Sequence, residues 1–192
     1  MSNAIKIGII GGAGYTGGEL IRLLIHHPKT EIVFIHSKSN AGNPVSKVHA
    51  DLLGDTDLKF TGDLSDNIDV LFLCVGHGQA RKFLEENKIV DTIKVIDLSH
   101  DFRLSNAASY QLPVTGNQKP VTRHFIYGLP ELNKEKIKSA DSIANPGCFA
   151  TCIQLGLLPL AKAGLLNEIY TTGITGSTGA GQSLTETSHF SW

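Results

Sequence analysis

A cysteine at the start of an expected helix is the residue of this chain best suited to covalent chemistry. Asn145, Pro146, Gly147 and Cys148 directly precede the apolar run 149–161. Cys148 should therefore lie where unpaired backbone amides meet the positive end of a helix dipole. A thiol in that field loses its proton more readily than a free thiol, and the thiolate is the form that attacks carbonyl carbon. We predict that Cys148 is a nucleophile rather than a buried packing residue.

Glycines near the other end of the chain are spaced for phosphate binding. The apolar run 5–10 leads into Gly-Gly-Ala-Gly-Tyr-Thr-Gly at residues 11–17, and a segment of helical character follows. Gly12, Gly14 and Gly17 satisfy G-x-G-x-x-G, whereas a start at Gly11 gives G-x-x-G-x-x-G. Either spacing lets the backbone approach a pyrophosphate that sits against the helix N-terminus. Strand, glycine turn and helix together predict a dinucleotide site of the Rossmann type.

The end of the second expected strand indicates which dinucleotide binds. The residue that contacts the adenosine ribose normally follows the glycines by about 20 positions, and Ser37 and Lys38 occupy that place. Glu31 lies at the wrong end of the strand to bind a 2′-hydroxyl, whereas a hydroxyl and an ammonium suit a 2′-phosphate. We predict NADP(H) rather than NAD, the alternative being that Lys38 is an ordinary surface lysine.

Composition excludes several other classes of protein. The 192 residues carry a formal charge of −1 with a pI near 6.7, so a nucleic-acid partner is not expected. The apolar stretches are too short for a membrane span, and no signal-peptide pattern opens the chain. Cys74, Cys148 and Cys152 are an odd number without C-x-x-C metal spacing. We expect no metal site, and reduced thiols in the cytoplasm.

The apolar runs alternate between strand and helix character, which predicts a doubly wound parallel α/β sheet. Strands are expected near residues 5–10, 31–36, 69–75, 93–98 and 141–144, and helices near 17–27, 77–87, 133–139 and 148–161. The continuous run 70–75 is typical of a central strand, so Cys74 within it should belong to the core. The stretch 101–130 lacks clear periodicity and is long for a connection, which favours a functional loop.

Ligands of an open parallel sheet bind beyond the carboxyl ends of its strands. After the third and fourth expected strands this rule selects His77, Gly78, Ser99, Asp101 and Arg103, and after the last it selects residues 145–148. The guanidinium of Arg103 could clamp an anion or pair with Asp101. His77 could cap a helix, pack on adenine or move protons. Asn145 could be a helix N-cap or a substrate contact.

Several segments together resemble the N-acetyl-γ-glutamyl-phosphate reductase family of arginine biosynthesis, in order and along nearly the whole chain. They are Gly14-Tyr15-Thr16-Gly17, Ile96-Asp97-Leu98-Ser99 with Asp101-Phe102-Arg103-Leu104, Tyr127-Gly128-Leu129-Pro130-Glu131-Leu132, Asn145-Pro146-Gly147-Cys148 and residues 176–181. The cysteine segment and the Tyr-Gly-Leu-Pro-Glu-Leu segment are specific. The glycine turn is shared with other Rossmann reductases.

The resemblance implies a homo-oligomeric, two-domain enzyme that reduces an acyl phosphate to a semialdehyde with NADPH through a cysteine thioester. Residues 1–147 would be the NADP-binding domain, and 148–192 would begin an α+β catalytic and dimerisation domain. By motif, Cys148 is the nucleophile and Ser99, Arg103 and Asn145 are substrate candidates. The implied cofactor contacts are Gly11, Gly14, Tyr15, Thr16, Gly17, Ser37, Lys38, Ser177, Gly179 and Gly181.

Two departures from the family pattern affect the expectation. Gln182 stands where the family commonly has arginine, and the family's catalytic histidine, its acid/base, lies in a segment beyond Trp192. Loss of a positioned proton donor typically costs about 10²- to 10⁴-fold in rate. We therefore expect a fragment of a longer reductase, poorly active alone. Two alternatives stay open, an aspartate-semialdehyde dehydrogenase and a non-catalytic NADP-binding module.

Overall fold

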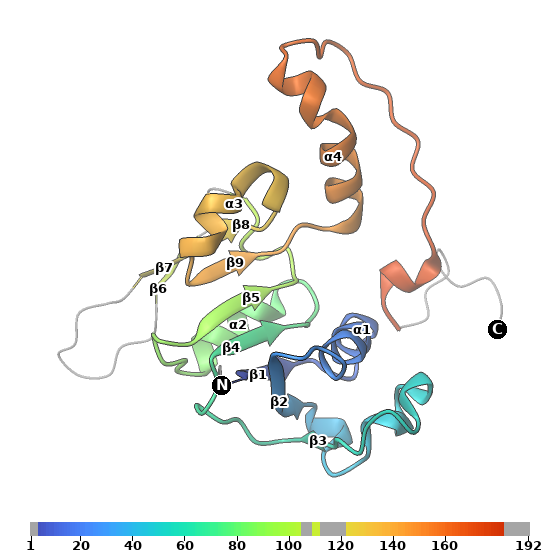
Figure 1. Ribbon diagram of the computed structural model, residues 1–192, viewed down its shortest axis with the longest axis vertical. Helices are drawn as coiled ribbons and strands as arrows, with labels where there is room; N and C mark the ends of the chain where they lie inside the picture. The colour runs from blue at the N-terminus through green and yellow to red at the C-terminus, as the bar shows by residue number, and fades with distance from the viewer. Residues whose placement is uncertain (1–3, 105–108, 112–121, 183–192) are drawn as a thin grey trace.

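The computed structural model describes residues 4–104, 109–111 and 122–182, and its centre is a seven-stranded parallel sheet (Figure 1). The strands are ordered β3-β2-β1-β4-β5-β9-β8. Their bounds are β1 Ile5–Ile10, β2 Thr30–His36, β3 Phe60–Thr61, β4 Val70–Leu73, β5 Lys94–Asp97, β8 Ile126–Tyr127 and β9 Ser142–Ala144. A separate antiparallel pair contains β6 Ser109–Gln111 and β7 Thr122–His124. The chain runs outward from β1 in both directions, so the order reverses between β1 and β4, where α/β sheets bind ligands.

Helices and short 3₁₀ turns connect the strands. The helices are α1 Tyr15–Leu24, α2 Gln79–Glu86, α3 Pro130–Ser139 and α4 Cys148–Lys162. The 3₁₀ turns are η1 Lys38–Asn40, η2 Val45–Lys47, η3 Ala50–Leu52 and η4 Ser177–Ala180. None of the helices within the described ranges has the length and apolar content needed to cross a membrane.

Both faces of the sheet are covered, which explains why its strands are mostly apolar. Successive residues of β1 belong to different core clusters, Ile9 to one and Ile10 to the other. Ile21 of α1 packs with the Ile9 cluster, and Leu84 of α2 packs with the Ile10 cluster. Strands buried on both sides need apolar residues at every position rather than at alternate ones. The predicted doubly wound α/β architecture is confirmed, as are all five expected strands and all four expected helices.

The region 101–130, expected to lack regular structure, contributes β8 to the edge of the sheet and both strands of the small antiparallel pair. These strands have two or three residues each, too few to show a periodic pattern. Residues 105–108 and 112–121 lie outside the described residues.

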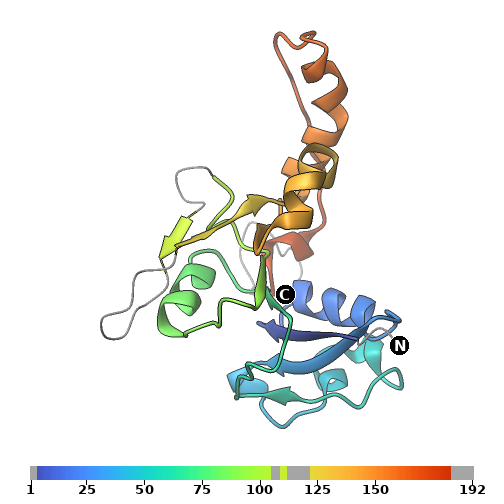
Figure 2. The same ribbon diagram turned by 60° about the vertical axis from the view of Figure 1, so that its left-hand side comes forward.

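Helix α4 projects away from the sheet, and the chain then returns toward α1 (Figures 1 and 2). None of its residues is buried, and Phe149, Ile153, Leu155 and Leu160 are exposed apolar side chains. The only part of α4 beside the sheet is its first turn, which carries Cys148.

Candidate active site at the carboxyl edge of the sheet

The glycine turn after β1 is shaped by close backbone approaches. Gly11 has φ +77°, and a Cβ there would lie 2.4 Å from the carbonyl oxygen of Cys74, which directly follows β4. A Cβ on Gly17 would lie 2.7 Å from the carbonyl oxygen of Gly11. A side chain at Gly11 would push the turn away from the end of β4, and one at Gly17 would push it away from α1. The turn therefore lies after β1, beside the residue that follows β4, where the sheet order reverses.

The start of α1 fits the phosphates of a dinucleotide. Gly14 is the N-cap and makes no side-chain cap hydrogen bond, and the first turn, with Tyr15 and Thr16 exposed, contains no acidic residue. The amides of this turn and the positive end of the helix thus keep their affinity for an anion. A Cβ on Gly14 would approach only the Gly11 carbonyl, at 3.6 Å, so the side facing away from the protein is open.

The adenosine end of the predicted cofactor site follows β2. Ser37 is the N-cap of η1, which starts at Lys38, and its hydroxyl accepts a hydrogen bond of 3.1 Å from the side-chain amide of Asn40. Glu31 pairs with Lys6 near the opposite end of β2. Ser37 and Lys38 thus lie at the carboxyl end of β2, the position on which the prediction of NADP was based.

Asp101 caps α2 from a distant loop. One carboxylate oxygen accepts the amide of Gly78 at 2.6 Å, and the other accepts that of Arg81 at 3.0 Å. His100 Nδ1 also lies 3.0 Å from Asp101. Burial opposes ionisation of Asp101, but these amides and His100 outweigh it and lower its pKa. Asp101 therefore binds a helix end and His100, so the alternative in which Arg103 pairs with Asp101 is wrong.

His77 does not cap α2, because Gly78 is the N-cap. Its ring stacks on His100 with centroids 4.0 Å apart and planes at 13°, and its Nδ1 accepts the His100 amide at 3.3 Å. Burial lowers the pKa of His77, and the nearby His100 and Arg103 lower it further, against a smaller opposing effect of Asp101. Because Nδ1 of His77 accepts a hydrogen bond, the proton of its neutral ring lies on Nε2.

Ser99 stabilises the turn after β5 instead of facing the open edge. It is 1% exposed, its hydroxyl donates to Asp97 at 2.8 Å, and the same oxygen accepts the Asp101 amide at 3.1 Å. Burial raises the pKa of Asp97, and the two hydrogen bonds from Ser99 oppose that rise. This arrangement leaves Ser99 no exposed hydroxyl for the substrate contact expected from the sequence.

Arg103 joins the turn after β5 to the turn that carries the cysteine. Its Nε donates to the Asn145 carbonyl at 2.7 Å, and its Nη2 donates to the Leu98 carbonyl at 2.8 Å. A Cβ on Gly147 would lie 2.9 Å from Arg103 Nη1. The guanidinium therefore packs beneath Gly147 and fixes the position of the residue before Cys148.

Asn145 is not the N-cap of α4, because Gly147 holds that place. The backbone amide of Asn145 donates to the Asp97 carbonyl at 2.8 Å, and its side-chain amide donates to the Pro146 carbonyl at 3.1 Å. The substrate contact stays a prediction, while the helix-cap alternative is wrong.

Cys148 is the first residue of α4 and is exposed. The N-cap makes no side-chain hydrogen bond to the first turn, and the first backbone bond of the helix runs from the Thr151 amide to the Gly147 carbonyl at 2.9 Å. Cys74, in contrast, packs against the core, and burial together with Asp97 raises its pKa to about 12. The structure thus distinguishes Cys74, which packs in the core, from Cys148, which lies at an open helix N-terminus.

The segment 177–181 returns to the glycine turn from the far end of α4. Ser177 and Gly179 lie in η4, Gly181 follows it, and the side-chain amide of Gln182 donates to the Ala13 carbonyl at 3.1 Å. Figure 1 shows η4 beside α1. The residue at which the chain departs from the family pattern is therefore the one that contacts the predicted phosphate turn.

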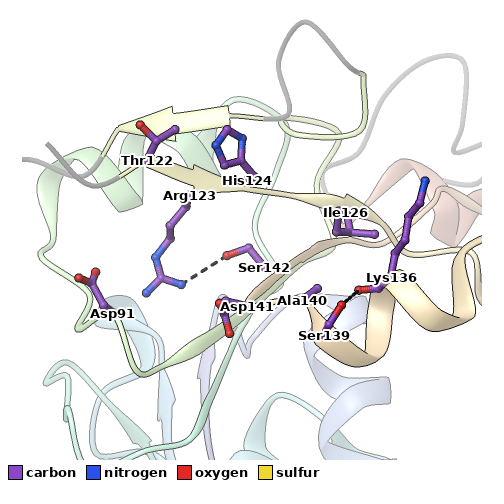
Figure 3. Close-up of a pocket in the computed structure, with 10 residues that line it drawn as sticks. All are labelled: Asp91, Thr122, Arg123, His124, Ile126, Lys136, Ser139, Ala140, Asp141 and Ser142. Atoms are coloured by element: carbon purple, nitrogen blue, oxygen red, sulfur yellow. Dashed lines mark hydrogen bonds between the residues drawn. The ribbon is translucent and has the colours of Figure 1, made fainter.

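A hollow of about 430 Å³ lies elsewhere, at the amino end of β9, and contains none of the predicted site residues (Figure 3). Arg123 forms much of its wall, is 6% exposed, and donates to the carbonyls of Val90 and Ile93 at 2.9 Å. Through these hydrogen bonds the guanidinium of Arg123 connects β7 to the loop before β5.

Comparison with known proteins places the chain among dehydrogenases. The profile of the semialdehyde dehydrogenase NAD-binding domain matches residues 6–140, and that of the semialdehyde dehydrogenase dimerisation domain matches 148–192. Proteins named N-acetyl-gamma-glutamyl-phosphate reductase from Flavobacterium johnsoniae and Bacteroides fragilis are 53% and 56% identical over 189 and 190 residues. Each alignment covers 98% of this chain and 55% of the relative. The chain thus spans about half the length of the curated relatives it matches.

A solved structure, aspartate semialdehyde dehydrogenase with NADP from Candida albicans, shares the fold with a TM-score of 0.57 at 16% identity. The match covers 85% of this chain and 48% of that one.

Proposed function

The chain belongs to the semialdehyde dehydrogenase family through its NAD-binding domain, and on that basis we propose that it is the cofactor-binding and nucleophile-bearing part of an N-acetyl-γ-glutamyl-phosphate reductase. The observation that carries the proposal is the position of Cys148. Cys148 is exposed at the start of α4, the helix that follows β9. The glycine turn follows β1 of the same sheet. Relatives at 53–56% identity bear the name of this reductase.

The chemistry begins with the Cys148 thiolate, which attacks the γ-carbonyl carbon of the acyl phosphate. A carbon–sulfur bond forms, the carbon–oxygen bond to phosphate breaks, and phosphate leaves with the electron pair. When bound, NADPH supplies the hydride that reduces the resulting thioester. The carbon–sulfur bond then breaks, which releases the semialdehyde and regenerates the thiolate of Cys148.

The first turn of α4 provides donors for the oxygen that gains charge in these steps. The amides of Cys148, Phe149 and Ala150 precede the first backbone hydrogen bond of the helix, and the N-cap supplies no side-chain acceptor. One well-placed donor of this kind can contribute about 3 kcal/mol to the stability of the transition state. Arg103 positions the turn before this helix, through its bond to the Asn145 carbonyl.

For the cofactor, we infer NADP(H). The uncapped start of α1 suits the pyrophosphate, and the hydroxyl of Ser37 with the ammonium of Lys38 suits a 2′-phosphate. We assign Ser177, Gly179 and Gly181 to the nicotinamide side from the family resemblance, and the bond from Gln182 to Ala13 supports a position of this segment beside the glycine turn.

We assign residues 1–147 to the NADP-binding domain and 148–192 to the beginning of the catalytic and dimerisation domain, near the boundaries of the two matching profiles. The complete enzyme would be a homo-oligomer. Three free thiols favour a reducing compartment such as the cytoplasm.

The test is the reverse reaction of the gene's complete product. N-acetylglutamate semialdehyde, phosphate and NADP should yield NADPH, with NADP preferred to NAD and with Lys38→Ala reducing that preference about tenfold. Aspartate semialdehyde should be oxidised much more slowly. Equal or faster oxidation of aspartate semialdehyde would contradict the substrate assignment, and tighter binding of NAD than NADP would contradict the cofactor assignment.

A further inference from the structure

His49 lies against the glycine turn although it comes 37 positions after Gly12 in the sequence. The residue is 7% exposed, and its Nε2 is 2.8 Å from the Gly12 carbonyl oxygen. A carbonyl oxygen only accepts hydrogen bonds, so Nε2 must carry a hydrogen and donate it. The turn is therefore held by a side chain from the segment between β2 and β3.

The same imidazole also packs on α1. A Cβ on Gly18 would lie 2.5 Å from both Cε1 and Nδ1 of His49, so the ring occupies the place that a side chain at Gly18 would take. The ring of Phe60 is tilted against it with centroids 6.2 Å apart. One side chain thus contacts both the turn and the helix whose amides face the phosphates.

The backbone of Gly12 is held on both of its flanking peptide groups. Its amide donates to the His36 carbonyl at the end of β2, at 3.3 Å, while its carbonyl accepts from His49. A Cβ on Gly12 would overlap Ile35 Cγ2, at 2.2 Å. Both polar backbone groups of Gly12 are thus bonded inside the protein, which fixes the orientation of the peptides before and after it.

The position of His49 is itself fixed by core anchors. Its amide donates to the Val45 carbonyl and its carbonyl accepts from the Leu52 amide, both at 3.0 Å. Val45 and Leu52 are 0% and 1% exposed. These anchors lie in the segment between β2 and β3, which begins with Ser37 and Lys38, so the same segment joins the expected 2′-phosphate end of the cofactor site to the pyrophosphate turn.

We propose that His49 is a positioning residue for the cofactor pyrophosphate, acting through its hydrogen bond to the Gly12 carbonyl and its packing on Gly18. This role rests on the proposed binding of NADP. It predicts that removal of the Nε2 donor weakens ligands with a pyrophosphate and spares ligands that occupy only the adenosine end.

The experiment measures the binding of NADP and of 2′-AMP, which lacks the pyrophosphate, to the 192-residue chain and its variants. In His49→Gln the side-chain amide reaches as far as Nε2 of histidine, whereas in His49→Asn it is too short to reach Gly12. We expect the dissociation constant for NADP to rise about tenfold in His49→Asn, the equivalent of one hydrogen bond, and less than about threefold in His49→Gln. Binding of 2′-AMP should be unchanged in both.

Each other outcome overturns the assignment. If His49→Asn binds NADP as tightly as the wild type, or if His49→Gln is as defective as His49→Asn, the hydrogen bond does not position the cofactor. Equal losses for NADP and 2′-AMP would indicate a general structural role instead. If the wild-type chain binds 2′-AMP but not NADP, the role of His49 fails, and if it binds neither ligand, the proposed function fails with it.

Discussion

Replacement of Asp101 with asparagine should destabilise the chain by about 2 kcal/mol. The carboxylate is 3% exposed and accepts the amides of Gly78 and Arg81 at the start of α2. Asparagine can keep an acceptor for only one of them and turns an N–H toward the other. A hydrogen bond to a charged group contributes about 1.5–3 kcal/mol, and loss of a negative charge at a helix N-terminus costs about 0.3–1 kcal/mol. Rearrangement of the side chain and of the first turn of α2 offsets part of these losses, which leaves about 2 kcal/mol.

The assay is urea unfolding of Asp101→Asn at pH 7, beside the wild type and an Asp55→Asn control at an exposed turn. The pKa of Asp101 is lowered in the folded chain. Its contribution is therefore complete above the unfolded-state pKa near 3.9 and is lost as the pH falls through the lower folded-state value. The stability difference between wild type and Asp101→Asn should shrink below about pH 4. A difference under about 0.5 kcal/mol at pH 7, within the range of ordinary surface substitutions, would refute the capping role.

Three further predictions concern the thiols, the glycine turn and the cysteine turn. Maleimide at pH 8 should label the two exposed thiols of α4 in the native chain and leave Cys74 unlabelled, because burial raises its pKa to about 12; mass spectrometry showing three labels would contradict this. Gly17→Ala should weaken NADP binding at least about tenfold, because its Cβ would lie 2.7 Å from the Gly11 carbonyl oxygen. Gly14→Ala should have a smaller effect, because the nearest atom to its Cβ would be 3.6 Å away. Titration of both variants with NADP tests this, and an equal loss in the two would contradict it. Arg103→Lys should speed amide hydrogen exchange in the turn before α4, since lysine cannot hold both carbonyls at once; unchanged exchange would show that the guanidinium does not fix that turn.

The sequence was sufficient to predict the main elements of the fold because the long strands are continuous apolar runs between turn signals. The run 70–75, which contains β4, is unbroken and ends at Gly76, and the mostly apolar segment that forms α4 is preceded by Pro146 and Gly147. In contrast, β3 and β8 have two residues each, and their place in the sheet depends on pairing with β2 and β9. No local pattern encodes that pairing.

The candidate site was predictable in position and less so in the roles of its side chains. The sheet topology correctly brought Ser99, Arg103 and Asn145 to one edge, but it does not determine where their polar atoms point. Ser99 bonds within its own turn, and Arg103 bonds to backbone carbonyls. The contacts of Asp101 with α2 and of His49 with Gly12 join segments 20 to 37 residues apart, and no spacing rule reveals them.

The most direct test of the central claim is the mass of the enzyme after incubation with N-acetyl-γ-glutamyl phosphate in the absence of NADPH. If Cys148 forms the thioester, the wild type should gain one acyl group per active site and release one equivalent of phosphate. Cys152→Ser, which removes the other exposed thiol of the same helix, should behave identically, whereas Cys148→Ser should show neither change. Acylation that persists in Cys148→Ser would contradict the account.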